Sequence, residues 1–186
     1  GVIDSNGDNV IDPSYAEMII VPNSKNDVFL CTYDVDYDNN TYKTKALNSE
    51  NKEIFTEYDH VEAISNKDTD NNLWYENDVV RVEKNGLYGL IDLSGKELLQ
   101  CEYAKIEALE GVQNTFKITK DGKVGIADNK GNVLITPSYA EITSLDKDKS
   151  QGFIVKSSDG KYGIVDTANK QVLETKYDTV EKIIML

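Results

Sequence analysis

Short segments in which apolar and polar residues alternate recur along the whole chain. The alternation is clear in residues 87–92, 116–119 and 153–156. A period of two is typical of β-strands with one buried face. No long stripe of apolar residues at helical spacing interrupts these segments, so the pattern predicts an all-β protein.

One phrase, Gly-x-x-Gly-x-x-Asp, occurs at residues 86–92, 122–128 and 160–166. Its Asp is followed three residues later by Gly or Asn, and eleven residues later always by Tyr. An earlier copy begins at Val2-Ile-Asp4, and a worn copy lies at 46–48. The anchor positions 4, 48, 92, 128 and 166 are 44, 44, 36 and 38 residues apart. Such a period indicates an array of similar supersecondary units.

Turn chemistry explains most positions of the phrase. The Asp and the Gly three residues later suit a type I turn, in which Asp accepts from the backbone and Gly is left-handed. The pairs Asn85-Gly86, Asp121-Gly122 and Asp159-Gly160 predict type I′ hairpins. We expect an aromatic ring of a neighbouring repeat to pack on the second Gly, and the recurrent Tyr to bond its hydroxyl to the backbone. The structural positions predicted in this way are Gly89, Asp92, Gly95, Tyr103, Gly125, Asp128, Gly131, Tyr139, Gly163, Asp166 and Tyr177.

These strands and turns predict one continuous domain over residues 1–186. Its units are four-stranded and antiparallel, and hairpins join each unit to the next. The repeats cover 1–43, 44–85, 86–121, 122–159 and a partial copy at 160–186. We expect a bend at the recurrent Tyr and then a third strand. Because the chain starts in a first strand and stops in a third, an open curved array is favoured over a closed, propeller-like one.

Residues 122–142, with Gly-Lys-Val-Gly-Ile-Ala-Asp at their start and Thr-Pro-Ser-Tyr139 near their end, resemble the WG β-repeat family, also called KWG repeats, found mostly in bacteria. The eponymous Trp is replaced by Tyr88, Val124 and Tyr162. The resemblance implies a β-rich array with an interaction or surface role, and it offers no catalytic residues.

The formal net charge of −13 argues against nucleic acid and anionic membranes as partners, because both require basic patches. No apolar run approaches the roughly 18 residues of a membrane span, so membrane insertion is not expected. Because the first residue falls inside a repeat phrase, we expect an exported or cell-surface protein whose targeting segment lies outside this sequence. Cys31 and Cys101 occupy non-equivalent repeat positions, which predicts free thiols rather than a disulfide.

Catalytic and metal chemistry have weak signals. The single histidine, His60, has no partner at the spacing of a triad or zinc site, so no catalytic residue is predicted. Asp34, Asp36 and Asp38 place carboxylates at alternate positions, as calcium loops do. They lack the Gly and Glu of an EF-hand, so solvated loop charge is favoured and calcium is the alternative. No other cofactor is expected.

The second repeat departs from the others at two places. Thr44-Lys45 replaces the Tyr-Gly pair, and an insertion from Ser65 to Asp78 carries Trp74 and Tyr75. Insertions in repeat arrays map to loops that often bind. Trp74 and Tyr75 are therefore the candidate ligand-binding residues; the alternative is that Trp74 folds back over the worn repeat.

The sequence favours a non-enzymatic repeat scaffold that binds a protein or a surface ligand. The first alternative is a carbohydrate or cell-envelope binding module, with calcium as an aid. The second is a set of regulatory or sensor repeats in a larger exported protein.

Overall fold

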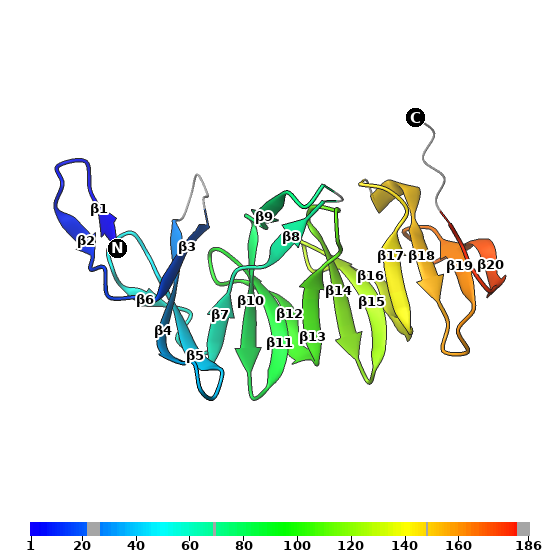
Figure 1. The fold of residues 1–186 in the computed structure, drawn as a ribbon, viewed down its shortest axis with the longest axis horizontal. Helices are drawn as coiled ribbons and strands as arrows, with labels where there is room; N and C mark the ends of the chain where they lie inside the picture. The colour runs from blue at the N-terminus through cyan, green and yellow to red at the C-terminus, as the bar shows by residue number, and fades with distance from the viewer. Residues whose placement is uncertain (22–26, 69, 148, 182–186) are drawn as a thin grey trace. The chain divides into compact units, whose positions relative to one another are not determined.

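The computed structural model describes residues 1–21, 27–68, 70–147 and 149–181. Strands account for 57% of the chain, and the described residues contain no α-helix. The chain forms two compact units, and Figure 1 labels their strands. Unit 1 comprises Gly1–Ile64 and Tyr75–Cys101, and unit 2 comprises Ser65–Trp74 and Glu102–Leu186.

Unit 1 contains a small pair of strands and two four-stranded antiparallel sheets. The pair is β1 (Val2–Ile3) with β2 (Asn9–Ile11). The first sheet has the order β3 (Glu17–Val21), β4 (Val28–Asp36), β5 (Thr41–Leu47) and β6 (Glu53–Ile54). The second has the order β7 (His60–Glu62), β10 (Val79–Lys84), β11 (Leu87–Asp92) and β12 (Glu97–Tyr103).

Unit 2 repeats this plan. Its insertion forms a ribbon of β8 (Ser65–Lys67) and β9 (Leu73–Tyr75). One antiparallel sheet has the order β13 (Lys105–Ala108), β14 (Thr115–Lys120), β15 (Lys123–Asp128) and β16 (Val133–Tyr139). The other has the order β17 (Glu141–Ser144), β18 (Phe153–Lys156), β19 (Tyr162–Val165) and β20 (Gln171–Tyr177). A 3-10 turn, η1 (Lys149–Gln151), lies between β17 and β18.

The all-β prediction with four-stranded antiparallel sheets is confirmed, and none of the described sheets closes into a barrel. Each sheet joins the third and fourth strands of one sequence repeat to the first two strands of the next. The predicted hairpins therefore lie inside sheets. The chain leaves one sheet directly after the recurrent Tyr: Tyr103 ends β12 and Lys105 begins β13. The predicted third strand is present there.

Each phrase Asp has its carboxylate occupied by its own turn. Asp128 Oδ1 accepts hydrogen bonds of 2.9 Å from the amides of Lys130 and Asn132, and Gly131 has φ +84°. In the worn copy Asn48 accepts from two turn amides in the same way. Burial alone would raise the pKa of the Asp128 carboxyl, but the Asn132 side chain and the turn amides hold it below its usual value. The carboxylate is therefore a structural acceptor.

Replacing Asp128 by alanine is expected to lower the free energy of unfolding by about 2 kcal/mol, because two turn amides lose their acceptor. Asp128→Asn keeps an acceptor, as Asn48 does, and should cost about 0.5 kcal/mol. Since the folded-state pKa is depressed, the charge contribution is present above the unfolded pKa and is lost as the pH falls below about 4. Urea unfolding of wild type and Asp128→Asn between neutral and acidic pH measures this, and identical pH profiles would contradict it.

Two of the three predicted type I′ hairpins have the required geometry. Asn85 and Gly86 have φ +54° and +77°, and Asp121 and Gly122 have +51° and +71°. The prediction at Asp159-Gly160 is wrong, because only Gly160 has a positive φ there. That turn is longer: the Ser157 amide donates to the Lys161 carbonyl across it.

The second Gly of the phrase is needed because the neighbouring strand's backbone passes close to it. The expectation that an aromatic ring packs on this Gly is wrong. A Cβ on Gly125 would lie 2.2 Å from the Ile135 carbonyl oxygen and 2.7 Å from Pro137 N. The following strand bulges here, since its register jumps between the pairs Val124–Tyr139 and Ile126–Ile135. Gly163 faces a similar register shift in β20, and a Cβ on Gly89 would lie 2.6 Å from the Leu99 carbonyl oxygen of β12.

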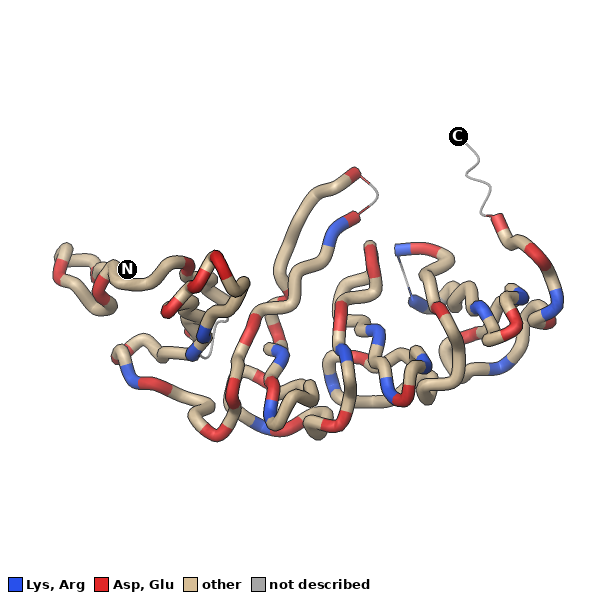
Figure 2. The backbone as a smooth tube through the Cα atoms, turned by 60° about the horizontal axis from the view of Figure 1, so that its bottom comes forward, with Lys and Arg blue, Asp and Glu red and all other residues tan. Residues whose placement is uncertain are grey.

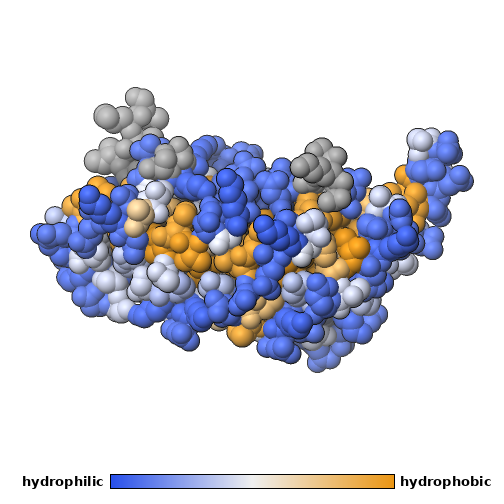
Figure 3. Space-filling view, turned by 180° about the vertical axis from the view of Figure 1, so that it is seen from behind, coloured by the Kyte–Doolittle hydropathy of each residue, from blue (hydrophilic) through white to orange (hydrophobic). Residues whose placement is uncertain are grey.

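Each unit has its own buried cluster of β-branched and other aliphatic side chains. Unit 1 has a cluster that includes Leu30, Val61 and Val82 and another that includes Ile11, Phe29 and Leu47. The unit 2 cluster includes Phe153 and Val155. Figure 3 shows hydrophilic residues over most of one face, with hydrophobic ones visible between them. In the described part of the chain, no helix has the length and apolar character that crossing a membrane requires.

The hydroxyl of Tyr139 donates to the Asn169 side chain (3.0 Å), not to the expected backbone group.

Candidate binding cleft in unit 1

The second repeat lacks the glycine that lets the next strand bulge across its neighbour. Lys45 stands at that position, where a side chain is incompatible with the close backbone approach found at Gly89 and Gly125. The partner strand β6 accordingly pairs only with Ala46 and Leu47 and ends at Ile54, and Phe55 takes φ +60°. The edge of β5 before Ala46 is thus left without a strand partner from β6.

A cleft of about 490 Å³ opens beside this shortened strand, within unit 1. One wall is a face of β3, β4 and β5, and the other comes from β7 and β10. Its lining residues are Ala16, Glu17, Ile19, Leu30, Cys31, Thr32, Val35, Tyr37, Tyr42, Thr44, Val61, Glu62, Ala63 and Arg81. The volume lies in the range of about 300–1,000 Å³ that is typical of ligand sites.

Three polar side chains form a connected cluster in the cleft. Arg81 Nη2 donates to Glu62 Oε2, and the Tyr42 hydroxyl donates to Glu62 Oε1 at 2.8 Å. Burial would raise the pKa of the Glu62 carboxyl, but Arg81, and then the Tyr42 hydroxyl, hold it below its ordinary value. The Glu62 carboxylate conversely raises the pKa of Tyr42. Arg81 also stacks over the ring of Tyr88, with 5.1 Å between its guanidinium carbon and the ring centroid. Both carboxylate oxygens of Glu62 are therefore bonded within the cluster, and the charges of Glu62 and Arg81 neutralise each other.

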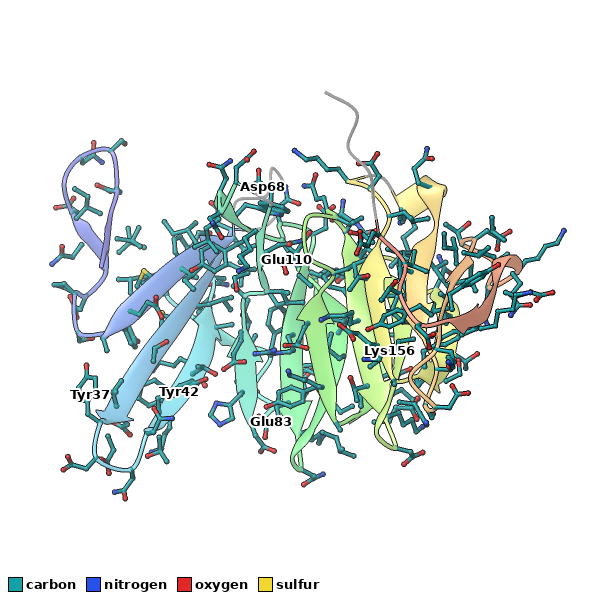
Figure 4. All side chains as sticks on the ribbon, turned by 45° about the vertical axis from the view of Figure 1, so that its right-hand side comes forward. Tyr37, Tyr42, Asp68, Glu83, Glu110 and Lys156 are labelled. Carbon is teal, nitrogen blue, oxygen red and sulfur yellow. The ribbon has the colours of Figure 1, made fainter. Side chains whose placement is uncertain are left out.

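The remaining lining is apolar at depth and aromatic at the rim. Ile19, Leu30 and Val61 supply apolar side chains. Tyr37 is 87% exposed and Tyr42 is 46% exposed, and Figure 4 shows both near the β4–β5 turn. Exposed aromatic side chains over an apolar floor are typical of binding surfaces.

A bulge in β4 places Tyr37 at the cleft. The alternation predicts Phe29, Cys31, Tyr33, Val35 and Tyr37 on one face. Asp34 instead has φ +50°, and the register shifts between Tyr33–Lys43 and Asp36–Thr41. The bulge brings Val35 and Tyr37 to the cleft with Leu30 and Thr32, so the single-face prediction is wrong beyond Tyr33.

Unit 2 has a cleft of about 500 Å³ at the equivalent place, next to β17. The cross-strand pair Glu62–Arg81 corresponds there to Thr143–Ile154 in β17 and β18. Lys117 lines the unit 2 cleft at the position that Leu30 holds in unit 1. The two clefts share a backbone plan and differ in chemistry.

The predicted ligand-binding residues Trp74 and Tyr75 lie in β9, outside both clefts. Adjacent residues of a strand point to opposite faces, so the two rings do not form one stacking platform. Tyr75 is 38% exposed, while Trp74 is half-buried.

A buried asparagine anchors the insertion inside unit 2. The Asn66 amide nitrogen donates to the carbonyls of Leu109 (3.3 Å) and Val112 (3.1 Å). Its amide oxygen accepts from the backbone amides of Gly111 (3.1 Å) and Lys67 (2.8 Å). The insertion is therefore held to the β13–β14 loop by specific hydrogen bonds.

Replacing Asn66 by alanine should lower the free energy of unfolding of unit 2 by about 3 kcal/mol, because several buried backbone groups lose a partner. The exposed Asn72 gives a matched control, and Asn72→Ala should cost about 0.5 kcal/mol or less. Urea unfolding measures both. Equal midpoints for the two variants would show that the anchor carries no stability.

The acidic and histidine candidates each have a nearby partner in the described part of the chain. Asp34 pairs with Lys43 at 2.8 Å, and Asp36 accepts from the amides of Asp38 and Asn39. No group of three or more His, Cys, Asp or Glu side chains converges among the described residues. His60 lies 3.3 Å from the Thr44 hydroxyl. Cys31 and Cys101 are free thiols, as predicted.

Four residues of the cleft were not predicted from the sequence: Glu62, Arg81, Tyr42 and Tyr37. One signal was available: Arg81 is the only arginine among the 20 basic residues. It lies in the second repeat, which the sequence already marks as unusual at Thr44. Thr44 does line the cleft, and its hydroxyl accepts from the Val61 amide at 2.9 Å.

Charge is distributed unequally between the units. The ranges of unit 1 contain 18 acidic and 7 basic residues, a formal net charge of −11. Those of unit 2 contain 15 acidic and 13 basic residues, a net charge of −2. Figure 2 shows acidic positions predominating along the N-terminal strands. The cleft of unit 1 thus lies in a strongly acidic unit.

Comparison with known proteins gives one family match. Residues 88–123 match the family described as "WG containing repeat", which confirms the resemblance for this segment. No curated protein matches the sequence. Among solved structures, the chain is similar to "Crystal structure of HIRA(644-1017)", with a TM-score of 0.35 and 13% identity. That alignment covers 89% of this chain and 54% of the other, so this chain spans about half the length of the matched chain.

Proposed function

We propose that this chain, which carries a WG-containing repeat at residues 88–123, is a non-enzymatic scaffold that binds a protein through the cleft of unit 1. The observation that carries the proposal is the cleft itself. It has an apolar floor, exposed Tyr37 and Tyr42 at the rim, and a fixed Glu62–Arg81–Tyr42 cluster.

The residue types support a protein partner. Tyr and Arg are enriched at the centres of protein interfaces because they combine buried area with directed hydrogen bonds. The Thr44 hydroxyl, which lies 3.3 Å from His60 Nδ1, also accepts from the Val61 amide, and each phrase Asp serves its own turn. A scaffold role accounts for these features without chemistry at the site.

Selection from a peptide display library with the purified full chain tests the proposal. Enriched peptides that bind wild type and lose binding to Tyr42→Ala would support it. Failure to enrich any peptide, or binding unchanged in Tyr42→Ala, would contradict it.

Carbohydrate binding is the second candidate. It is favoured by the exposed side chains of Leu73 (64%) and Tyr75 (38%) on one face of β9. A glycan array separates the two functions: saccharide binding lost in Trp74→Ala and Tyr75→Ala, but retained in Tyr42→Ala, would favour this candidate over the cleft.

A further inference from the structure

We propose that the unit 1 cleft receives a lysine or arginine side chain of an extended, cationic polypeptide segment. This inference rests on the proposed function and specifies the chemistry of the partner.

The lining matches the two parts of a basic side chain. Lysine and arginine have a long apolar stem and a charged head, and the stem packs on apolar surface while the head stays at a polar rim. Ile19, Leu30 and Val61 provide the apolar surface at depth. Glu17 and the rings of Tyr37 and Tyr42 provide a carboxylate and two π faces in the same lining. A neutral or acidic side chain would leave Glu17 without a complement.

The opposite face of the same sheet shows this chemistry with a lysine of the chain. Lys45 Nζ lies 5.2 Å from the ring centroid of Tyr15 and 4.9 Å from that of Tyr33. Lys156 over Tyr162 at 5.1 Å repeats the arrangement in unit 2. Each of these pairs lies within the distance at which a cation is attracted to a ring face. Tyr37 and Tyr42 present comparable rings that are still open to a partner.

The charges of the cleft favour a cation that is supplied from outside. Glu62 already holds Arg81, so this pair supplies structure and not a free charge. Glu17 has no basic partner in the part of the chain that the structure describes. With a net charge of −11 on unit 1, the surrounding field attracts cations to the cleft.

The unit 2 cleft provides an internal contrast. Its lining contains Lys117, Glu110 and Glu141 and no aromatic side chain, and its unit is nearly neutral. Both carboxylates already lie near lysines of the chain, Glu110 3.8 Å from Lys67 and Glu141 4.0 Å from Lys156. An incoming cation would therefore find neither an aromatic ring nor an unpaired carboxylate there. A basic segment should therefore distinguish two clefts that share one backbone plan.

Two synthetic peptides of about eight residues test the proposal, one alternating lysine with valine and one with glutamate in place of lysine. Titration calorimetry with the full chain should show binding of the first peptide only. Tyr37→Ala should weaken it about fivefold to tenfold through the lost ring. Glu17→Gln should weaken it about threefold at low salt and less at high salt. Glu141→Gln, in the unit 2 cleft, is the matched control and should leave the affinity unchanged.

The outcomes separate this inference from the proposed function. An equal loss of affinity in Glu141→Gln and Glu17→Gln, or an affinity that Tyr37→Ala leaves unchanged, would show a non-specific polycation effect. Either result would overturn the inference. Displacement of the peptide by an equal concentration of spermidine would also overturn it, because the site would then read charge alone. If library selection enriches neutral or acidic peptides that require Tyr42, the proposed function stands and the cationic partner falls. If it enriches none, both fall.

Discussion

Gly125→Ala is expected to lower the free energy of unfolding of unit 2 by about 3 kcal/mol. An alanine is intrinsically better than glycine in a strand by about 0.5–1 kcal/mol. At this position the added Cβ would lie 2.2 Å from the Ile135 carbonyl oxygen and 2.7 Å from Pro137 N. These are backbone atoms of β16, so relief requires the strand to move, and overpacking of this kind costs about 1–3 kcal/mol or more. The steric effect therefore outweighs the propensity.

The neighbouring glycine of the same phrase is the matched control. Gly122 also precedes a strand residue, but nothing lies within 4 Å of its added Cβ and its φ is +71°. Asparagine tolerates that conformation, so Gly122→Asn should cost about 0.5 kcal/mol. Urea unfolding followed by circular dichroism compares the two variants. An unfolding midpoint for Gly125→Ala at or above that of Gly122→Asn would contradict the close approach of the bulge.

Phe153→Ala should cost about 4 kcal/mol of unfolding free energy, because it removes a fully buried ring and leaves a cavity. Phe153 is completely buried and belongs to the unit 2 cluster together with Val155, Ile142 and Leu109. The large loss should appear in the denaturation midpoint at unchanged slope.

Truncation of an exposed ring gives the comparison. Tyr37 is 87% exposed, so Tyr37→Ala should change stability by about 0.5 kcal/mol or less. This result would also show that the variant used for binding is folded. A Phe153→Ala protein as stable as wild type would place the core of unit 2 elsewhere.

Local signals predicted the strands and most turns. Asp92, Asp128 and Asp166 each act within five residues of chain, through backbone amides that the sequence spacing already fixes. The positive φ of Gly95 and Gly131, and of Asn51 and Asn169, follows from the same short segments. Local chemistry of this kind needs no tertiary contact. The turn at Asp159-Gly160 differs because Ser157 begins a longer turn that the dipeptide alone does not show.

Features that depend on distant pairings were not predictable in this way. The ion pair of the cleft joins Glu62 and Arg81 across the strands β7 and β10, with the insertion lying between them in the sequence. The bulge at Asp34 reverses the face of Tyr37 without any mark in the alternation. The chain passes from one sheet to the next directly after the recurrent Tyr, and this change decides which strands share a sheet. The apolar residues after that Tyr follow neither the period of a strand nor that of a helix. The sequence did indicate that the second repeat differs from the others at Thr44-Lys45. These residues lie in β5 beside the shortened strand β6, and Thr44 lines the cleft.

Mapping of the bound site in the full chain tests the central claim most directly. Backbone amide shifts in ¹H–¹⁵N spectra would be followed during titration with the lysine–valine peptide. The account predicts shifts that cluster on β3, the Tyr37 to Thr44 segment and β7, with the Arg81 side chain responding and the β17 amides unchanged. Shifts that cluster on β8 and β9 around Trp74, or that spread evenly over acidic turns of both units, would contradict it.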